Sequence, residues 1–494
     1  MIDAVDRVLL ARIAKQAMLD YGLLADVPPA AQAQAGEMSE QPGESGPGVV
    51  DLRHLPWTSI DNPESRDLDQ IEAMESGPEG TRLYIAIANV ARTVQPGSPI
   101  DLYAAANTTS VYTGVQVFTM LPRRLSHDLT SLLPGRPRHA MVIDMRLTPG
   151  GHLGSTAIYP AVVENHAKLN YPAISHWLQG GPLPTELAGK SQLQHQVHSQ
   201  DVLAQLLRKN RMAAGALDLE TGELAPVIGP DDQVIGLEPR VQDRAGSIIE
   251  ELMIAANRAV VGSLTSSGLP CLSRIVRRPK HWDRIVEYAL ARGVRLPDEP
   301  DSTALARFLE RMRERRPHEF HEVSLSIVKL IGRGEYAAHR PGDAPIGHFG
   351  LATSEYGHAT APNRRYPDLV MQRLLAGDKS SLDFDDLEGI ARHCTNMEAQ
   401  AEKVERRVHK SIAAALIAHR IGEVFEGVVT KAQLGSTFVH IFHPAMQGMI
   451  VDDTSRVKVG DKVRVRLAKV DIERSFIDFT IEHTPGRETL RPNR

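Results

Sequence analysis

The stretch Ile60-Asp61-Asn62-Pro63-Glu64-Ser65-Arg66-Asp67-Leu68-Asp69-Gln70 places three aspartates close together in the chain. Carboxylates this near in sequence repel one another unless a cation neutralises them, and Mg²⁺ prefers carboxylate oxygens while it keeps part of its water shell. Pro63 turns the chain after Asp61, and Asp67 and Asp69 point to the same side where the backbone is extended. The run therefore predicts a metal site. A solvated acidic loop at a helix start is the alternative, because Asp is common there.

Length and charge set the next limits. A chain of 494 residues exceeds what one hydrophobic core usually organises, so two or three domains are expected. The net charge of -5 argues against a protein that coats nucleic acid through its overall charge, whereas a local basic channel for one strand is compatible with it. Three basic clusters could line such a channel or form an ordinary solvated surface: Arg123, Arg124, Arg136 and Arg138; Arg274, Arg277, Arg278 and Lys280; and Arg364 with Arg365.

The cysteines and the N-terminal residues indicate a compartment. Cys271 and Cys394 are the only cysteines and lack the paired spacing of a zinc or iron–sulfur site, which fits a reducing environment. The start of the chain has no basic segment followed by an apolar run, and no stretch reaches the roughly 20 apolar residues of a membrane span. We expect a cytoplasmic protein without disulfides or membrane contact.

Residues 1–50 are expected to form a short extension. Residues 4–23 carry apolar side chains at helical spacing and predict an amphipathic helix. Residues 26–48 contain almost nothing large and apolar and are typical of a linker, although their segment 29–35, Pro-Ala-Ala-Gln-Ala-Gln-Ala, is compatible with a helix. The extension is therefore a helix, or at most a helix-turn-helix, followed by a linker.

The following residues mix strands and helices, which predicts an α+β domain. Residues 83–90 form a continuous apolar run typical of a buried strand, and residues 141–147 alternate like a half-exposed one. Residues 248–262, 368–375 and 384–421 have helical periodicity. The last of these helices places Val404, Val408, Ile412 and Ala415 on one face.

A different pattern begins at Gly422. Five short strand-like segments follow, at 424–431, 437–442, 448–451, 462–467 and 476–481, and this spacing predicts a small closed barrel. Lys462, Arg464 and Arg466 alternate along one segment, and Phe438 lies on another. Such residues can contact phosphates and stack on bases, although aromatic residues in a barrel are also common in its core.

Six segments that occur in the same order resemble the ribonuclease II / ribonuclease R family of exoribonucleases. The resemblance implies a mixed sheet-and-helix catalytic domain over residues 51–421 with a central RNA channel, an RNA-binding OB fold of five strands over 422–485, and a basic tail at 486–494. Better-known members carry tandem cold-shock domains ahead of the catalytic domain, and about 50 residues leave no room for two such barrels. The segments are IDNPESRDLDQ, YIAIANVARTVQPGSPID, VYTGVQVFTMLPRRLSHDLTSLLPG, IEELMIAANRAV, HFGLATSEYGHATAPNRRYPDLVMQRLL and GEVFEGVV.

The family motif also implies a metal centre. Its members use four aspartates to hold two Mg²⁺ ions, which Mn²⁺ can replace, and Asp61, Asp67 and Asp69 match the first three positions. Gln70 stands at the fourth. Because Gln offers one neutral oxygen where Asp offers two charged ones, the site has lost a negative charge, and one ion is expected to bind more weakly or through water. Glu72 or a shifted water could compensate for this loss.

The resemblance assigns roles to side chains outside the acidic run. Arg364 matches the arginine that binds the scissile phosphate, and its planar fork can meet two phosphoryl oxygens. Arg365 beside it is interpreted as a surface cation. Tyr112 matches an aromatic residue that stacks on the 3′-terminal nucleotides. Glu405 is similar to a glutamate near the substrate, although an ion pair on the helix surface explains it equally well. Asn89 stands where relatives commonly have Asp and is expected to make a structural hydrogen bond.

These features together predict a monomeric, Mg²⁺-dependent 3′-to-5′ exoribonuclease. It would hydrolyse single-stranded RNA to 5′-nucleoside monophosphates through a two-metal mechanism, with Phe438 and Tyr112 among its RNA contacts. The alternative is a catalytically weakened RNA-binding regulatory protein of the same fold. Gln70 is the residue on which the two hypotheses differ.

Overall fold

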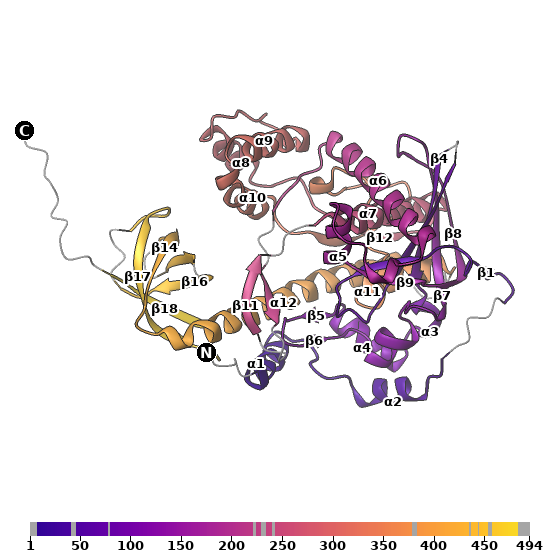
Figure 1. Ribbon diagram of the computed structural model, residues 1–494, viewed down its shortest axis with the longest axis horizontal. Coiled ribbons are helices and arrows are strands. Elements are labelled where there is room, and N and C mark those ends of the chain that lie inside the picture. The colour runs from indigo at the N-terminus through magenta and orange to yellow at the C-terminus, as the bar shows by residue number, and fades with distance from the viewer. Residues whose placement is uncertain are drawn as a thin grey trace, which may run out of the picture.

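A mixed sheet lies toward one end of the protein, on the right of Figure 1. The computed structural model describes residues 7–40, 46–77, 80–220, 224–228, 234–239, 243–377, 383–433, 436–442, 444–452 and 457–482. Within these residues, seven strands form this sheet in the order β1-β8-β7-β4-β3-β2-β9. Their bounds are β1 Val50–Asp51, β2 Thr58–Asp61, β3 Gln70–Gly77, β4 Gly80–Ala88, β7 Pro137–Leu147, β8 Leu153–Glu164 and β9 Ala167–Asn170.

The middle of this sheet is buried on both faces. The strands β3, β4, β7 and β8 pair antiparallel in succession, and β2 joins β3 antiparallel and β9 parallel. The prediction of a buried strand at 83–90 is confirmed by β4. The prediction that residues 141–147 are half-exposed is wrong, because residues 141–145 of β7 are all buried and only Arg146 of this segment is exposed. Asp144, on the face that the alternating pattern assigned to solvent, is instead buried between Arg82 of β4 and Tyr159 of β8, which both donate to its carboxylate.

Helices surround the sheet and connect its edge to the rest of the molecule. α7 (Arg244–Ser266) packs against β7 and β8 and contacts α5 (Tyr171–Leu178) and α6 (Ser191–Ala213). α3 (Val90–Thr93) and α4 (Pro99–Asn107) follow β4, and α11 (Tyr366–Leu375) packs against α3. The helices predicted at 248–262 and 368–375 are confirmed by α7 and α11.

A helical subdomain projects from one side of the molecule (Figure 1). It contains α8 (Trp282–Leu290), α9 (Ser302–Arg315) and α10 (Pro317–Ile331), which share a separate core centred on Phe308. Paired strands β12 (Cys271–Ile275) and β13 (Glu335–His339) lead into and out of it. Smaller pairs are β5 (Val111–Tyr112) with β6 (Val117–Phe118) and β10 (Leu224–Ile228) with β11 (Val234–Pro239).

The long helix α12 (Phe384–Ile417) runs from the sheet domain to the barrel (Figure 1). Its predicted face is confirmed, since Val404, Val408 and Ile412 are fully buried against α1. Near its end, Ala413, Ala414 and Ile417 belong to the core of the barrel. The Ser411 hydroxyl also donates to the backbone oxygen of Ile472 at 2.7 Å. One helix therefore joins the two domains through apolar contacts and a hydrogen bond.

The predicted barrel is confirmed. The five described strands β14 (Val424–Lys431), β15 (Thr437–Phe442), β16 (Ala445–Ile450), β18 (Phe476–Ile481) and β17 (Lys462–Asp471) close in that order. Phe438 is half-buried, lies outside the barrel core and has the Lys431 ammonium 5.7 Å from its ring centroid. Arg464 and Arg466 both form ion pairs with Glu482. The predicted basic tail at 486–494 lies outside the described residues.

The N-terminal extension packs more tightly than a linker. α1 (Arg7–Asp20) lies along α12, whereas α2 (Pro29–Glu37) packs against α4, so the two helices do not form a helix-turn-helix unit. The linker interpretation is wrong for α2, and its helical alternative is confirmed. Ala31 and Ala35 are buried in the main core, since small side chains allow close backbone approach without large apolar groups. No described helix is long and apolar enough to cross a membrane.

This packing predicts that Ala31→Leu destabilises the fold by about 1–3 kcal/mol, because the added atoms have no space between α2 and the core. The measurement is the free energy of unfolding in urea. Ala33→Leu is the matched control, because Ala33 is exposed on the same helix. Equal stabilities of the two variants would contradict the docking of α2.

Candidate active site

The acidic loop joins β2 to β3 and is fixed from three sides. Asp61 ends β2 and Gln70 begins β3. The Lys168 ammonium on β9 donates to the backbone oxygens of Pro63 at 2.8 Å and Ser65 at 2.6 Å. Leu68 is buried in the main core, and its amide donates to the Ser131 hydroxyl. These contacts hold the predicted aspartates in one place although the loop has no regular structure.

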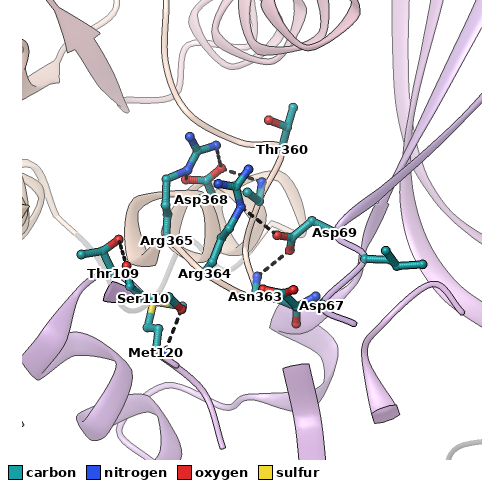
Figure 2. Close-up of polar contacts among 12 residues, drawn as sticks. Asp67, Asp69, Thr109, Ser110, Met120, Thr360, Asn363, Arg364, Arg365 and Asp368 are labelled. Atoms are coloured by element: carbon teal, nitrogen blue, oxygen red, sulfur yellow. Dashed lines mark hydrogen bonds and ion pairs between the residues drawn. The ribbon is translucent and has the colours of Figure 1, made fainter. Parts of the chain in front are cut away.

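Asp69 connects the acidic loop to the arginine segment, which carries Arg364 and Arg365 directly before α11 (Figure 2). Its Oδ1 accepts a hydrogen bond from the backbone N–H of Asn363 at 2.8 Å, and its Oδ2 accepts one from Arg364 Nε at 3.3 Å. Asp69 is 2% exposed, whereas the Arg364 side chain is 44% exposed. The pair therefore presents a guanidinium at the surface of the site while its carboxylate stays inside.

Backbone contacts position Arg364 from its other side. The Ser110 amide donates to the Arg364 backbone oxygen at 2.9 Å, and the Tyr366 amide donates to the Thr108 oxygen at 2.8 Å. Figure 2 shows Ser110 beside the arginine segment, with its hydroxyl bonded to Met120. The residues around β5 and the residues before α11 thus form one unit.

Tyr112 and Glu405 extend this unit. The Tyr112 hydroxyl donates to Asp67 Oδ2 at 3.2 Å, and its backbone N–H donates to Glu405 Oε1 at 3.0 Å. Tyr112 is 40% exposed, which leaves part of its ring accessible. The structure therefore brings Tyr112, Asp67 and Glu405 together, and it gives Glu405 a contact with the Tyr112 backbone that sequence did not predict.

Burial dominates the electrostatics of the carboxylates. Desolvation raises the pKa of both Asp61 and Asp69 to about 7, and the charge of Asp67 adds to this shift, although Arg364 opposes it. The Oδ2 atom of Asp61 is buried and has no hydrogen-bond partner. Repelling, desolvated carboxylates of this kind are stabilised by a cation.

The carboxylates of the acidic loop suit a metal ion by their chemistry, but their present spacing does not form a set of metal ligands. Among the described residues, no three His, Cys, Asp or Glu side chains are close enough to hold an ion as they stand. Asp67 and Asp69 instead accept hydrogen bonds from Tyr112, Asn363 and Arg364. The buried, unpartnered oxygen of Asp61 and its repulsion by Asp67 fit a hard cation. The assignment of Asp61, Asp67, Asp69 and Gln70 as ligands stays a prediction.

Gln70 lies at the predicted place but contributes no charge. It is 7% exposed at the first position of β3, where it pairs with Ile87. No described residue forms a hydrogen bond with its side-chain amide. The amide is therefore free to offer its oxygen to a ligand.

The structure changes the interpretation of Arg365. Its guanidinium donates to both oxygens of Asp368, at 2.9 and 2.7 Å, and is largely buried at the start of α11. The prediction of a surface cation is therefore wrong, since this buried pair fixes the arginine segment. The expected structural role of Asn89 is confirmed, because its Oδ1 accepts from the Arg92 amide and caps α3.

Other predicted cations are also used within the fold. Arg138 is buried and pairs with Glu40, and Arg274 pairs with Glu398. Phe438 lies on the barrel, away from the acidic loop. Sequence reasoning missed Lys168, because nothing in its local pattern shows that β9 would pair with β2 beside the loop.

The structure combines a sheet domain that holds an aspartate–arginine contact with a closed barrel, and one long helix joins the two. Residues 49–377 match the RNB domain model, and residues 423–482 match that of the RNase II-type exonuclease C-terminal S1 domain. The chain therefore belongs to the RNB domain family. The resemblance inferred from the six segments is confirmed.

Individual relatives support this assignment. Ribonuclease R of Escherichia coli strain K12 is 30% identical over 91% of this chain and 59% of its own length, and that of Thermotoga maritima is 29% identical over 88% and 65%. The chain thus spans about three fifths of the length of these curated relatives. The apo form of Mycoplasma genitalium RNase R matches with a TM-score of 0.85 and 25% identity, over 95% of this chain and 77% of that one.

A further solved structure shares the fold alone. Yeast Ssd1, described as a pseudonuclease, matches with a TM-score of 0.70 and 15% identity, over 92% of this chain and 58% of that one. The fold therefore does not decide whether the site is catalytic, and the side chains must.

The Lys168 contacts predict that Lys168→Met loosens the acidic loop, because the backbone oxygens of Pro63 and Ser65 lose their donor. The measurement is amide hydrogen exchange of residues 62–67, which should become faster. Lys190→Met is the control, since Lys190 donates to the His166 backbone oxygen away from the loop. Unchanged exchange in the Lys168 variant would show that Lys168 does not hold the loop.

Proposed function

We propose that this protein is a divalent-cation-dependent exoribonuclease that shortens single-stranded RNA from its 3′ end. The observation that carries the proposal is the contact of Asp69 with Arg364, which joins the acidic loop to an accessible guanidinium. Tyr112, bonded to Asp67, presents a partly exposed ring beside the same centre. The phosphate of an RNA end would contact the guanidinium of Arg364 while its terminal base stacks on the ring of Tyr112.

The reaction would cleave the bond between the terminal phosphorus and the 3′ oxygen of the preceding nucleotide. Water adds to phosphorus, the 3′ oxygen leaves and gains a proton, and a 5′-nucleoside monophosphate is released. Asp61, Asp67, Asp69 and Gln70 would hold two Mg²⁺ ions, or Mn²⁺ in their place. When bound, such ions activate water and neutralise phosphoryl charge. Arg364 would donate to the phosphoryl oxygens and stabilise the charge that develops on them.

RNA would be held at two separate places. The ring of Tyr112 offers a sequence-independent stacking surface, and Glu405 fixes the backbone that carries it. On the barrel, Phe438 with Lys431 offers a second aromatic and cationic contact. A strand that reaches both would pass through a channel in the catalytic domain. The proposal includes a monomer in the cytoplasm, where the two buried, free cysteines would stay reduced.

The second candidate function is RNA binding with little catalysis. Gln70 favours it, because the neutral amide weakens cation binding compared with a carboxylate. A 5′-labelled oligonucleotide incubated with Mg²⁺ or with EDTA distinguishes the two. Shortening that requires Mg²⁺ supports the exoribonuclease, whereas an intact oligonucleotide with a mobility shift supports the binding protein.

Asp69→Asn should abolish hydrolysis and leave RNA affinity nearly unchanged. The substitution removes negative charge from the metal centre and from the ion pair with Arg364, but Arg364 remains a partly exposed cation and the stacking contacts are untouched. We expect a loss of more than about 100-fold in rate, beyond the usual effect of an outer-shell group. The rate on a short oligonucleotide and the Kd for the same RNA are measured in parallel. A variant that kept a tenth of the activity would exclude Asp69 as a metal ligand.

Phe438→Ala should weaken the binding of long RNA by about 1–3 kcal/mol, the usual contribution of one stacked base. Phe476→Ala is the control, because Phe476 is 56% exposed on β18 and takes no part in the contact between Phe438 and Lys431. Kd values from fluorescence anisotropy test this prediction. Equal affinities of the two variants would argue against a role of Phe438 in RNA binding.

Gln70→Asp should lower the Mg²⁺ concentration that gives half of the maximal rate, because the added negative charge strengthens cation binding. The rate at saturating Mg²⁺ should change little. The test is a titration of rate against Mg²⁺ for both proteins. A higher or unchanged Mg²⁺ requirement in the variant would show that position 70 does not face the cation.

A further inference from the structure

Next to the acidic loop lies a cluster of buried oxygen atoms without hydrogen-bond partners. Both carboxylate oxygens of Glu72 are buried and unpartnered, and so are Asp61 Oδ2, Thr58 Oγ1 and Gln200 Oε1. Glu72 is 0% exposed in the third position of β3. Few buried polar atoms in folded proteins lack a partner, so several on neighbouring elements indicate a missing ligand.

The strand register places Thr58, Gln70 and Glu72 on one face of the sheet. Thr58 on β2 is the antiparallel partner of Glu72 on β3, so their side chains extend from the same face. Gln70 extends from that face as well, because side chains two positions apart in a strand point to the same side. The side-chain amide of Gln200 on α6 donates to the backbone oxygen of Glu72 at 3.5 Å. Asp61 ends β2 three positions after Thr58, and its charge reaches Glu72, where it adds to desolvation in raising the pKa.

The chemistry of the cluster indicates the kind of ligand. The unpartnered atoms of Asp61, Glu72 and the Gln200 amide are oxygens, which accept hydrogen bonds or coordinate a cation once the carboxyl groups are ionised, and among these unpartnered atoms the Thr58 hydroxyl also donates. No described arginine or lysine forms an ion pair with Glu72. Leaving acceptors buried without donors is costly. A hard cation with retained water satisfies carboxylate and amide oxygens together.

We propose that Glu72 supplies the negative charge that Gln70 lacks, so that it acts as the fourth acidic group of the metal centre. Glu72 stands two positions after Gln70 on β3 and is completely buried. From there it would act on the ion held at Asp61, through water that the ion retains. This inference rests on the proposed function of the same site.

Metal binding without RNA tests the proposal. The probe is Mn²⁺, and its Kd is measured by electron paramagnetic resonance of the free ion with the full chain. Glu72→Gln should weaken Mn²⁺ binding by about 10- to 100-fold, as loss of an outer-shell partner does. Glu75→Gln is the matched control on the same strand, because Glu75 is exposed. Its affinity should equal that of the wild-type chain.

A second variant separates a metal role from a structural one. Glu72→Leu should weaken Mn²⁺ binding as much as Glu72→Gln does, and it should raise the melting temperature in EDTA because it removes a buried, unpartnered carboxyl group. If Glu72 only supported the fold, Glu72→Leu would lower the melting temperature and leave the Mn²⁺ affinity of the folded protein unchanged. That result would overturn the proposal.

Moving the charge back completes the test. The double variant Gln70→Asp/Glu72→Gln should regain at least the wild-type Mn²⁺ affinity, because it restores a carboxylate at position 70. If the wild-type chain binds Mn²⁺ and degrades RNA but Glu72→Gln keeps its affinity, the Glu72 proposal alone is overturned. If the wild-type chain neither binds Mn²⁺ nor degrades RNA, the proposed function fails and this inference fails with it.

Discussion

The contact of Asp69 with the Asn363 amide and with Arg364 is the interaction on which the site depends. Asp69 lies 294 residues before Asn363 and 295 residues before Arg364. The contact therefore joins two segments that are distant in sequence and enter the site from different elements. One segment is the loop between β2 and β3, and the other precedes α11. Because Asp69 is buried, its carboxylate is shielded from water even though Arg364 is partly exposed, and loss of the ion pair would leave a desolvated charge. The acidic loop and Arg364 therefore keep their places together.

Around this contact, polar side chains fix backbone segments that no helix or sheet holds. Arg365 is paired with Asp368, Lys168 holds the loop backbone, and Glu405 holds the backbone of Tyr112. Each of these long side chains satisfies groups that no helix or sheet satisfies. The cost of leaving such groups without partners makes the arrangement specific. Rigid support of this kind is what a site needs if it is to hold a phosphodiester in one orientation.

The acidic face of the site is satisfied less completely than the rest. Asp61 and Glu72 have buried oxygens without partners, and burial raises the pKa of both groups. The chain therefore retains unfavourable electrostatics next to the contact of Asp69 with Arg364. Sites that bind a ligand commonly keep such local conflict, because the ligand and not the protein supplies the missing partner.

The sequence alone determined the broad architecture and the identity of the candidate groups. Strand and helix periodicity identified β4, α7, α11, α12 and the barrel, because burial of an apolar face leaves a repeat in the chain. The run from Asp61 to Gln70, with Arg364 and Tyr112, was recognisable because side-chain type and spacing are local properties. The neutral residue at position 70 could be noted for the same reason.

Only the tertiary structure decided which groups meet and which are satisfied. Periodicity failed for β7, because Arg82 and Tyr159 of the neighbouring strands bury Asp144 on its polar face, and for α2, because alanines can pack closely without large side chains. Arg365 and Arg364 are neighbours of the same type, and only their partners separate a buried structural ion pair from an accessible cation. Lys168 and Glu72 gained their significance from strand pairing with β2. Contacts between distant segments depend on the free energy of the whole packed chain, which no local pattern contains.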